Sequence, residues 1–288
     1  MSSPVVLAFI TKNSATKLAK TSITLFDVLK STLQIPYRSI ILVDASTDET
    51  VDYFRKFCDE YGKELVLVRG GRTRGEARQI AIDIFLNNFT QEWLMFVDDD
   101  VILNPGWWSE AEPHTKNPRV GIIWGVNYDH SPERARYLKI LGVDYVQYLV
   151  KEFFHRGGTH DTMLRREAIK DIKIPPELHY YEDGYILRHV LNKGYEARIV
   201  YTGCTHYNPW TGEHLNKNEL RRMAYLAKKY GFEQPSWKRL FRSLLSFIPH
   251  LVTGTKTYGL VGGIRYAYRR WKAKVLFRWY LLTVKVYP

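Results

Sequence analysis

The 288-residue sequence has few cysteines and no long uncharged run of apolar residues. Its two cysteines, Cys58 and Cys204, lie far apart and have no zinc-binding spacing, which argues against a disulfide framework or a structural metal knuckle. The short apolar run near the N-terminus lacks a basic leader and a signal-type cleavage site, so we expect it to be a first strand. These absences favour a globular protein in a reducing, cytoplasmic setting.

Acidic residues are missing from the last part of the chain. No Asp or Glu follows Glu233, whereas 11 Lys and Arg residues do. The preceding part carries 31 basic and 30 acidic side chains, so nearly all of the net charge of +12 belongs to the C-terminal segment. We therefore treat residues 1–232 as the body and residues 233–288 as a basic, aromatic and helical tail.

The composition of this tail suits three kinds of contact. Basic side chains with aromatic anchors are typical of a segment lying in the headgroup region of an anionic membrane. The same residues could contact nucleic acid, or the aromatic side chains could simply pack on the body. Pro249, Lys256 and several glycines interrupt the apolar portion, which disfavours a membrane-spanning helix. We favour the membrane surface, because nothing in the body resembles a nucleic-acid-binding module.

Short apolar runs alternate with helix-like segments along the body. The runs lie at residues 5–11, 40–43, 64–68 and 93–97. Such strands, apolar throughout and separated by helices, predict an α/β fold with a mostly parallel sheet covered on both faces. We expect one helix at about residues 15–33, one that ends at Gly62 and a long one over residues 131–154.

Polar side chains follow three of these strands. Thr11 and Asn13 come after the first, Asp44 after the second, and Asp98–Asp100 after the fourth. Ligands of such sheets bind at the carboxyl ends of the strands, so these side chains are expected to line one pocket.

Three adjacent aspartates repel one another, and a helix cap would need only one of them. In an extended segment Asp98 and Asp100 would face one pocket while Asp99 points elsewhere. An Asp-x-Asp pair suits Mg²⁺ or Mn²⁺, which bind hard oxygen ligands and keep positions for substrate phosphates. A solvated acidic turn is the simpler alternative.

Six segments of the body resemble, in order, the motifs of the family 2 glycosyltransferases, which have the GT-A nucleotide-sugar fold. They are "VVLAFITKNSATKL", "IILVDASTDET", "GRTRGEARQIAI", "WLMFVDDDVIL", "TMLRREAI" and "YYEDGYILRHVLNKGYEARIV". Each motif alone is weak, whereas six in order over about residues 4–232 are specific. The resemblance implies a Rossmann-like GT-A domain at residues 1–232. Ala45 departs from the pattern, because the family often carries an acidic residue there.

The resemblance implies a donor-binding side of the pocket. Thr11, Asn13 and Asp44 would bind the base and ribose of a nucleotide sugar, although Asp44 could instead cap the following helix. Arg74 would lie near the diphosphate, with Arg72 as the alternative.

The same resemblance implies a metal site within the triple aspartate. Asp98 would contact the ribose or the metal, and Asp99 would belong to the donor pocket. Asp100 would be the main ligand of Mn²⁺ or Mg²⁺. His206 would be a second ligand, although a lone histidine is more often structural.

Asp183 would be the catalytic base, and Glu182 would orient the acceptor or the base. Inversion requires a carboxylate that accepts the proton of the attacking hydroxyl, opposite the diphosphate. The alternative is that both residues cap a helix.

We therefore expect a metal-dependent, inverting enzyme that moves a sugar from a UDP- or GDP-linked donor to a lipid-linked or membrane-proximal glycan acceptor. It would be cytoplasmic and peripheral at the inner face of the cell membrane, held there by residues 233–288. A polyprenyl-phosphate sugar synthase is an alternative of the same class. A non-catalytic protein that binds polyanions or membranes on a transferase-like fold is the alternative from another class.

Overall fold

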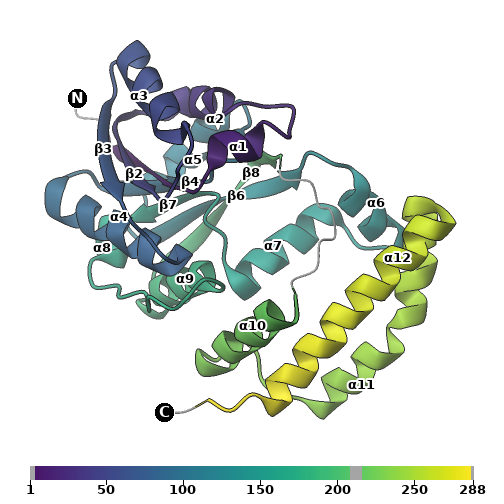
Figure 1. Ribbon diagram of the computed structural model, residues 1–288. Coiled ribbons are helices and arrows are strands. Elements are labelled where there is room, and N and C mark those ends of the chain that lie inside the picture. Colours follow the sequence, from purple (N-terminus) through teal and green to yellow (C-terminus); the bar gives the residue numbers. More distant parts are fainter. Residues whose placement is uncertain (1–3, 208–215, 287–288) are drawn as a thin grey trace. The chain divides into compact units, whose positions relative to one another are not determined.

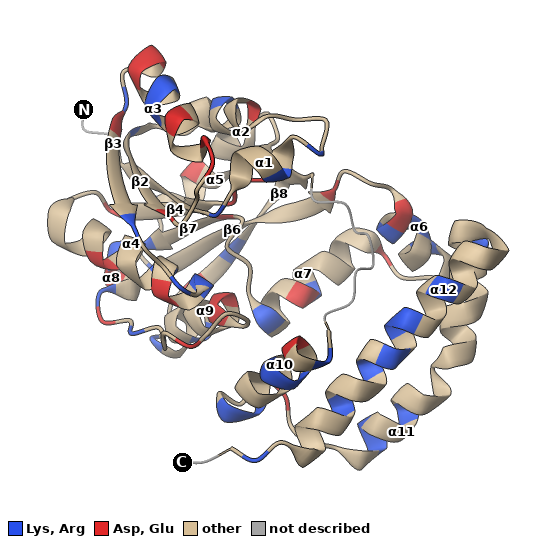
Figure 2. Ribbon diagram, in the orientation of Figure 1, with Lys and Arg blue, Asp and Glu red and all other residues tan. Residues whose placement is uncertain are grey.

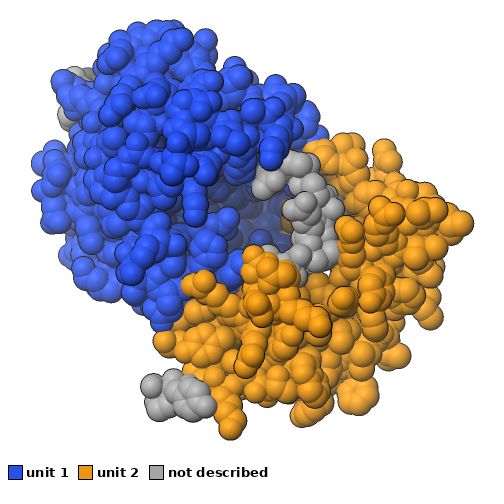
Figure 3. Space-filling view, viewed as in Figure 1, with its two compact units in different colours: residues 1–130, 149–208 blue, residues 131–148, 209–288 orange. Residues whose placement is uncertain are grey.

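The computed structural model describes residues 4–207 and 216–286. The chain divides into two compact units (Figure 3). Unit 1 comprises residues 1–130 and 149–208, and unit 2 comprises residues 131–148 and 209–288. Each unit is therefore built from two separate stretches of sequence.

Unit 1 contains one eight-stranded sheet with the order β3-β2-β1-β4-β7-β6-β8-β5. The strands are β1 (Val5–Thr11), β2 (Tyr37–Asp44), β3 (Glu64–Arg69), β4 (Trp93–Val97), β5 (Val101–Leu103), β6 (Val120–Asp129), β7 (Asp161–Arg165) and β8 (Glu196–His206). The first four strands are parallel, as are β6 and β8, whereas β7 runs antiparallel between β4 and β6. The sequence prediction of an α/β fold with a mostly parallel sheet is confirmed.

Helices cover both faces of this sheet (Figure 1). They are α1 (Ser14–Leu18), α2 (Leu25–Ser31), the 3-10 turn η1 (Thr32–Gln34), α3 (Thr50–Tyr61), α4 (Arg74–Asn88), α5 (Trp107–Thr115), α7 (Tyr145–Arg156), α8 (Arg166–Ile169) and α9 (Glu182–Asn192). Leu7 and Phe9 of β1 pack with Leu29 of α2 and Phe54 of α3 in one fully buried core. The core is thus contributed by continuous apolar strands, as expected for a sheet buried on both sides.

Two helix predictions were wrong in detail. The helix expected over residues 15–33 is broken, because Thr24 and Asp27 form a capping box that starts α2 as a separate helix. The helix expected over residues 131–154 is also broken: α6 (Glu133–Ile140) ends before Gly142, which has a left-handed φ of 69°. The predicted end of α3 at Gly62 is confirmed, since Gly62 has φ 60° and donates to Cys58 O.

Unit 2 consists of α6 and three further helices, α10 (Lys217–Lys229), α11 (Trp237–Leu245) and α12 (Phe247–Thr283). Gly259 kinks α12 with a non-helical φ of 74°. Lys228 Nζ of α10 donates to Val284 O at 2.8 Å, so a residue before position 232 packs within the helical tail. The division at residue 232 describes composition and stays a prediction.

Basic side chains are spread along α10, α11 and α12 (Figure 2). Glu233 forms ion pairs with Arg239 at 2.7 Å and Arg278 at 2.8 Å, which tie α11 to α12. Within residues 4–207 and 216–286, every helix is too short or too polar to cross a lipid bilayer.

Candidate functional site

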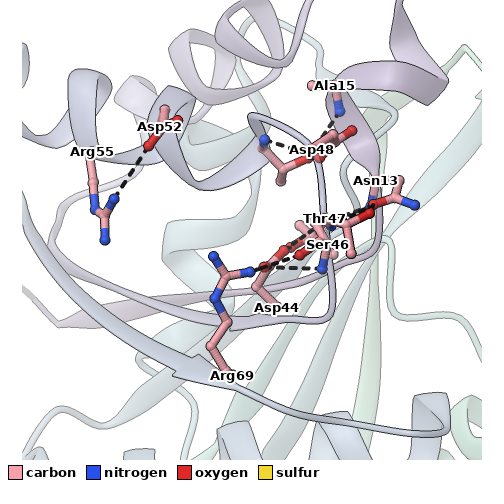
Figure 4. A network of polar contacts seen from close by, with 11 residues as sticks. Asn13, Ala15, Asp44, Ser46, Thr47, Asp48, Asp52, Arg55 and Arg69 are labelled. Carbon is pink, nitrogen blue, oxygen red and sulfur yellow. Dashed lines mark hydrogen bonds and ion pairs between the residues drawn. The ribbon is translucent and has the colours of Figure 1, made fainter.

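The loops that follow β1 and β2 form one hydrogen-bonded network (Figure 4). Thr11 and Asp44 pair in register at the ends of these strands, and Thr11 Oγ1 donates to Asp44 Oδ1 at 2.6 Å. Asp44 is fully buried and also accepts from Ser46 Oγ at 2.6 Å and from the guanidinium of Arg69. A buried carboxylate needs such partners, so Asp44 fixes the loop after β2.

Asn13 locks the two loops together. Its backbone has a left-handed φ of 53°, uncommon for a residue other than glycine. The Asn13 amide donates to Ser46 Oγ at 2.7 Å, and its side-chain oxygen accepts from the Thr47 amide at 2.8 Å. The two loops therefore form a preorganised rim at the carboxyl ends of β1 and β2.

The three aspartates after β4 divide between two cationic partners. Asp98 contacts Arg78, whereas Asp99 and Asp100 both contact Lys17 Nζ, at 3.1 and 2.6 Å. The alternation expected for an extended segment does not hold, because Asp99 and Asp100 lie in a turn. Asp99 also accepts from Ser14, and its burial raises the pKa of the carboxyl.

Asp100 and His206 lie side by side, as the predicted metal site requires. His206 Nε2 is 3.2 Å from Asp100 Oδ1. The Tyr207 amide donates to Asp100 O at 2.9 Å, which pins the end of β8 to this turn. Burial alone would raise the pKa of Asp100, but His206 and Lys17 outweigh it and hold that pKa well below its usual range. Burial opposes protonation of His206, yet Asp100 raises the pKa of its imidazole overall.

A buried arginine that sequence reasoning missed joins the two acidic segments. The Arg78 side chain, 6% exposed, places Nη2 3.6 Å from Asp98 Oδ1 and Nε 3.3 Å from Asp183 Oδ1. Its guanidinium also lies over the Phe96 ring, 5.1 Å from the centroid. Thr159 Oγ1 donates to Asp183 at 2.5 Å. One cation thus connects the end of β4 with the start of α9.

Glu182 and Asp183 begin α9 directly after a strained residue. Tyr181 has a left-handed φ of 70°, which turns the chain sharply into the helix. Glu182 is 2% exposed, and burial together with the Asp183 charge raises the pKa of Glu182 to about 8. A pKa of about 8 favours the protonated form of Glu182 at neutral pH, and the Asp183 carboxyl lies beside the Arg78 guanidinium.

The charge of Arg74 interacts with the acidic cluster, whereas Arg72 pairs with a residue in the first turn of α4. Although burial opposes it, the carboxylates of Glu182, Asp98 and Asp183 raise the pKa of Arg74. The Arg72 side chain is 88% exposed and pairs with Glu76 at 3.3 Å. Of the two arginines, Arg74 is the one whose pKa responds to these carboxylates.

His160, Asp161 and Cys204 have ligand atoms within 4.8 Å of one another, a grouping that the sequence did not suggest. The indole N–H of Trp124 is 3.3 Å from His160 Nε2, so Nε2 accepts and Nδ1 donates to Asp161 Oδ1 at 2.6 Å. Burial raises the pKa of the Cys204 thiol well above its usual value. These contacts make the cluster a support for Asp98, whose amide donates to His160 O at 2.9 Å.

Sequence reasoning found the carboxylates but missed their cationic and hydroxyl partners. These partners lie 20 to 105 positions from the carboxylates that they contact; they are Lys17, Arg69, Arg78 and Thr159. Lys17 and Arg78 carried a signal, because they lie within the quoted segments "VVLAFITKNSATKL" and "GRTRGEARQIAI".

The sequence profile of glycosyl transferase family 2 matches residues 10–175, more than half of the chain. A search of curated protein sequences finds no match.

Several solved structures share the fold at low sequence identity. A mannosyltransferase of Pyrobaculum calidifontis, in complex with GDP-mannose and Mn²⁺, has a TM-score of 0.54 and 17% identity, covering 98% of this chain and 72% of that one. Glucosyl-3-phosphoglycerate synthase of Mycobacterium tuberculosis, with Mn²⁺, UDP-glucose and phosphoglyceric acid, has a TM-score of 0.53 and 15% identity, covering 81% of each chain. S. aureus TarS 1–349 has a TM-score of 0.52 and 14% identity, covering 98% of this chain and 90% of that one.

Proposed function

The chain belongs to glycosyl transferase family 2, and from this premise we propose that it transfers a sugar from a nucleoside diphosphate donor to a hydroxyl acceptor with inversion at the anomeric carbon. The observation that carries the proposal is the Arg78 bridge. It brings the donor-side carboxylate Asp98 and the proposed base Asp183 to one guanidinium, although they are 85 positions apart.

The donor side is the rim formed by Thr11, Asn13 and Asp44. Carbonyl, amide and carboxylate groups there can hydrogen-bond the base and ribose of UDP or GDP. Arg74 supplies positive charge for the diphosphate, and Asp98 and Asp99 complete the donor pocket.

On the acceptor side, Asp183 takes the proton of the acceptor hydroxyl while that oxygen forms its bond to the anomeric carbon. The bond between this carbon and the diphosphate oxygen breaks, and the nucleoside diphosphate departs with the electron pair. Glu182, which keeps its own proton at neutral pH, acts as a hydrogen-bond donor that orients the acceptor or Asp183.

Asp100 and His206 fit a divalent ion, Mn²⁺ or Mg²⁺. A carboxylate oxygen and an imidazole nitrogen 3.2 Å apart are a donor set suited to such an ion. When bound there, the ion would offset the negative charge of the departing diphosphate. The mannosyltransferase and the synthase described above were both solved with Mn²⁺, which supports this choice.

The C-terminal hairpin of unit 2 is the proposed membrane anchor. Along the hairpin of α11 and α12, which reverses near Gly259, seven apolar side chains are between 42% and 78% exposed: Leu244, Leu245, Ile248, Val252, Leu260, Val261 and Ile264. Basic residues accompany this exposed apolar surface, and no acidic residue follows Glu233 in the sequence. An anionic lipid surface complements both features. The acceptor would accordingly be lipid-linked or membrane-proximal, and the enzyme peripheral at the cytoplasmic face.

The test is a thermal-shift panel of UDP, GDP and their sugar conjugates with Mn²⁺, Mg²⁺ or EDTA. Wild type is expected to be stabilised by one nucleotide family, and the metal-dependent part should be lost in Asp100→Ala. Asp171→Ala, which removes a 61% exposed carboxylate, is the matched control and should respond like wild type. Absence of any shift and of sugar-nucleotide turnover would contradict the proposed function.

A further inference from the structure

An ammonium group lies within the acidic cluster at the end of β4. Lys17 Nζ is 2.6 Å from Asp100 Oδ2 and 3.1 Å from Asp99 Oδ1. Ser14, in the same short helix, donates to Asp99 Oδ2. The helix α1 is therefore joined to both carboxyl groups that follow Asp98.

Asp100 is shared between two cationic groups. Its Oδ1 lies near His206 and its Oδ2 near Lys17, and the side chain is only 5% exposed. A divalent ion binds carboxylate oxygen at about 2.0–2.2 Å, closer than a hydrogen bond allows. An ion and an ammonium cannot both approach Oδ2 at contact distance without strong repulsion between their charges.

We propose that Lys17 is an internal counter-ion that competes with the divalent ion for Asp100 and is released when the ion and the nucleoside diphosphate bind together. The inference rests on the proposed function, since it takes Asp100 and His206 as the metal-holding residues. Lys17 can leave because its side chain is 41% exposed and flexible. A released ammonium is a point charge that can pair with phosphate oxygens.

Competition of this kind couples metal and nucleotide binding. Without nucleotide, an arriving ion must break the ion pairs of Lys17 with Asp99 and Asp100. With nucleotide, the diphosphate provides the ammonium with new anionic partners, so the ion meets less opposition. The free enzyme should therefore bind Mn²⁺ weakly, and the nucleotide-bound enzyme should bind it tightly.

The experiment is a Mn²⁺ titration of the full chain without nucleotide, followed by electron paramagnetic resonance of the free ion. Lys17→Met should lower the Kd for Mn²⁺ by about tenfold, which corresponds to about 1.4 kcal/mol of ion-pair free energy that the ion no longer has to overcome. Adding UDP or GDP should then improve the affinity of Lys17→Met for Mn²⁺ less than it improves that of wild type. Lys20→Met removes the same charge from an exposed position nearby and should leave the Kd close to wild type.

Lys17→Gln provides a second, polar variant if Lys17→Met does not fold, as judged by circular dichroism. If wild type binds Mn²⁺ and the folded variant has an unchanged or higher Kd for it, the role of Lys17 is wrong and the proposed metal site still stands. If wild type and both Lys17 variants bind no Mn²⁺ even with nucleotide, this inference and the proposed metal site both fail.

Discussion

At the scale of single residues, the start of α9 separates two adjacent carboxyl groups by their surroundings. Glu182 is buried away from water, whereas Asp183 is met by a guanidinium and a threonine hydroxyl. A low-dielectric site favours the neutral form of the buried Glu182 acid. The family resemblance assigned different roles to the two residues, and the fold shows how different their surroundings are.

Asp183→Asn is expected to lower kcat by about 10² to 10⁴-fold, because the amide cannot accept the acceptor proton. Nucleotide binding should remain near wild type, since the donor rim is formed by other residues. Steady-state kinetics and calorimetry with the nucleotide would measure the two effects separately. Near-normal turnover would show that the base assignment is wrong, and would point to an acceptor that is already anionic, such as a polyprenyl phosphate.

Glu182→Gln should change how stability depends on pH. The folded protein holds the Glu182 proton up to about pH 8, whereas the unfolded chain releases it near 4.5. The stability that this proton provides is complete below pH 4.5 and is lost as the pH rises toward 8. Over that window wild type should lose stability relative to Glu182→Gln, by on the order of a few kcal/mol.

Urea unfolding of wild type and Glu182→Gln at pH 5 and pH 8.5 would measure this difference. From pH 5 to pH 8.5 the unfolding free energy of wild type should fall relative to that of Glu182→Gln. The variant should therefore be relatively more stable at the higher pH. A difference in unfolding free energy that stays constant across the window would mean that Glu182 is ionised in the folded protein at neutral pH.

At the scale of elements, the backbone of Gly157 lies directly against the first turn of α9. Gly157 has a left-handed φ of 77°, and a Cβ there would lie 2.3 Å from the Asp183 carbonyl carbon. Because backbone cannot yield like a flexible side chain, any larger residue must displace Asp183. The position of the proposed base is thus set by a glycine 26 positions earlier in the sequence.

Gly157→Ala is expected to destabilise unit 1 by about 2 kcal/mol or more, from the clash and the strained φ together. It should also reduce kcat more than nucleotide affinity, since it moves the base and leaves the donor rim alone. The matched control is Gly194→Ala, where φ is 85° but nothing lies within 4 Å of the added carbon. If the two variants had equal activity and stability, Gly157 would have no role in placing α9.

Local sequence patterns predicted the helices and strands better than the contacts between them. The apolar strands, the Gly62 cap and the meeting of Thr11 with Asp44 followed from periodicity and from where strands end. The insertion of β7 between β4 and β6, and the Arg78 bridge, depend on contacts between distant segments. Such contacts leave no trace in a window of ten or fifteen residues, so a single sequence cannot reveal them.

At the scale of the whole molecule, the net charge of +12 is unevenly distributed, and the basic excess lies in the same segment as the exposed apolar side chains of the α11–α12 hairpin. Electrostatic attraction would bring the hairpin to an anionic surface, and burial of its leucines would hold it there. Salt screens the electrostatic attraction, whereas it does not screen the burial of apolar side chains.

The protein should bind vesicles of phosphatidylcholine with 30% phosphatidylserine, as measured by co-sedimentation. Added salt should weaken this binding without abolishing it. Leu245→Gln with Val261→Gln should weaken it by about tenfold or more, since both side chains are at least 70% exposed in the free protein. The control pair Leu33→Gln and Leu191→Gln alters exposed leucines of unit 1 and should bind like wild type. Stronger binding to an oligonucleotide than to these vesicles would favour the polyanion-binding alternative.

The division of unit 2 into two stretches of sequence has a consequence for synthesis on the ribosome. Tyr137 of α6 packs edge-on against Tyr266 of α12, with ring centroids 5.5 Å apart, yet 129 residues separate them. At translation rates of 5–20 residues per second, α6 waits roughly 6 to 26 seconds for its partner to emerge. During that interval β6 and β7, on either side of it, can already pair. The contact that joins α6 to the rest of unit 2 through Tyr266 can therefore form only after α12 has been made.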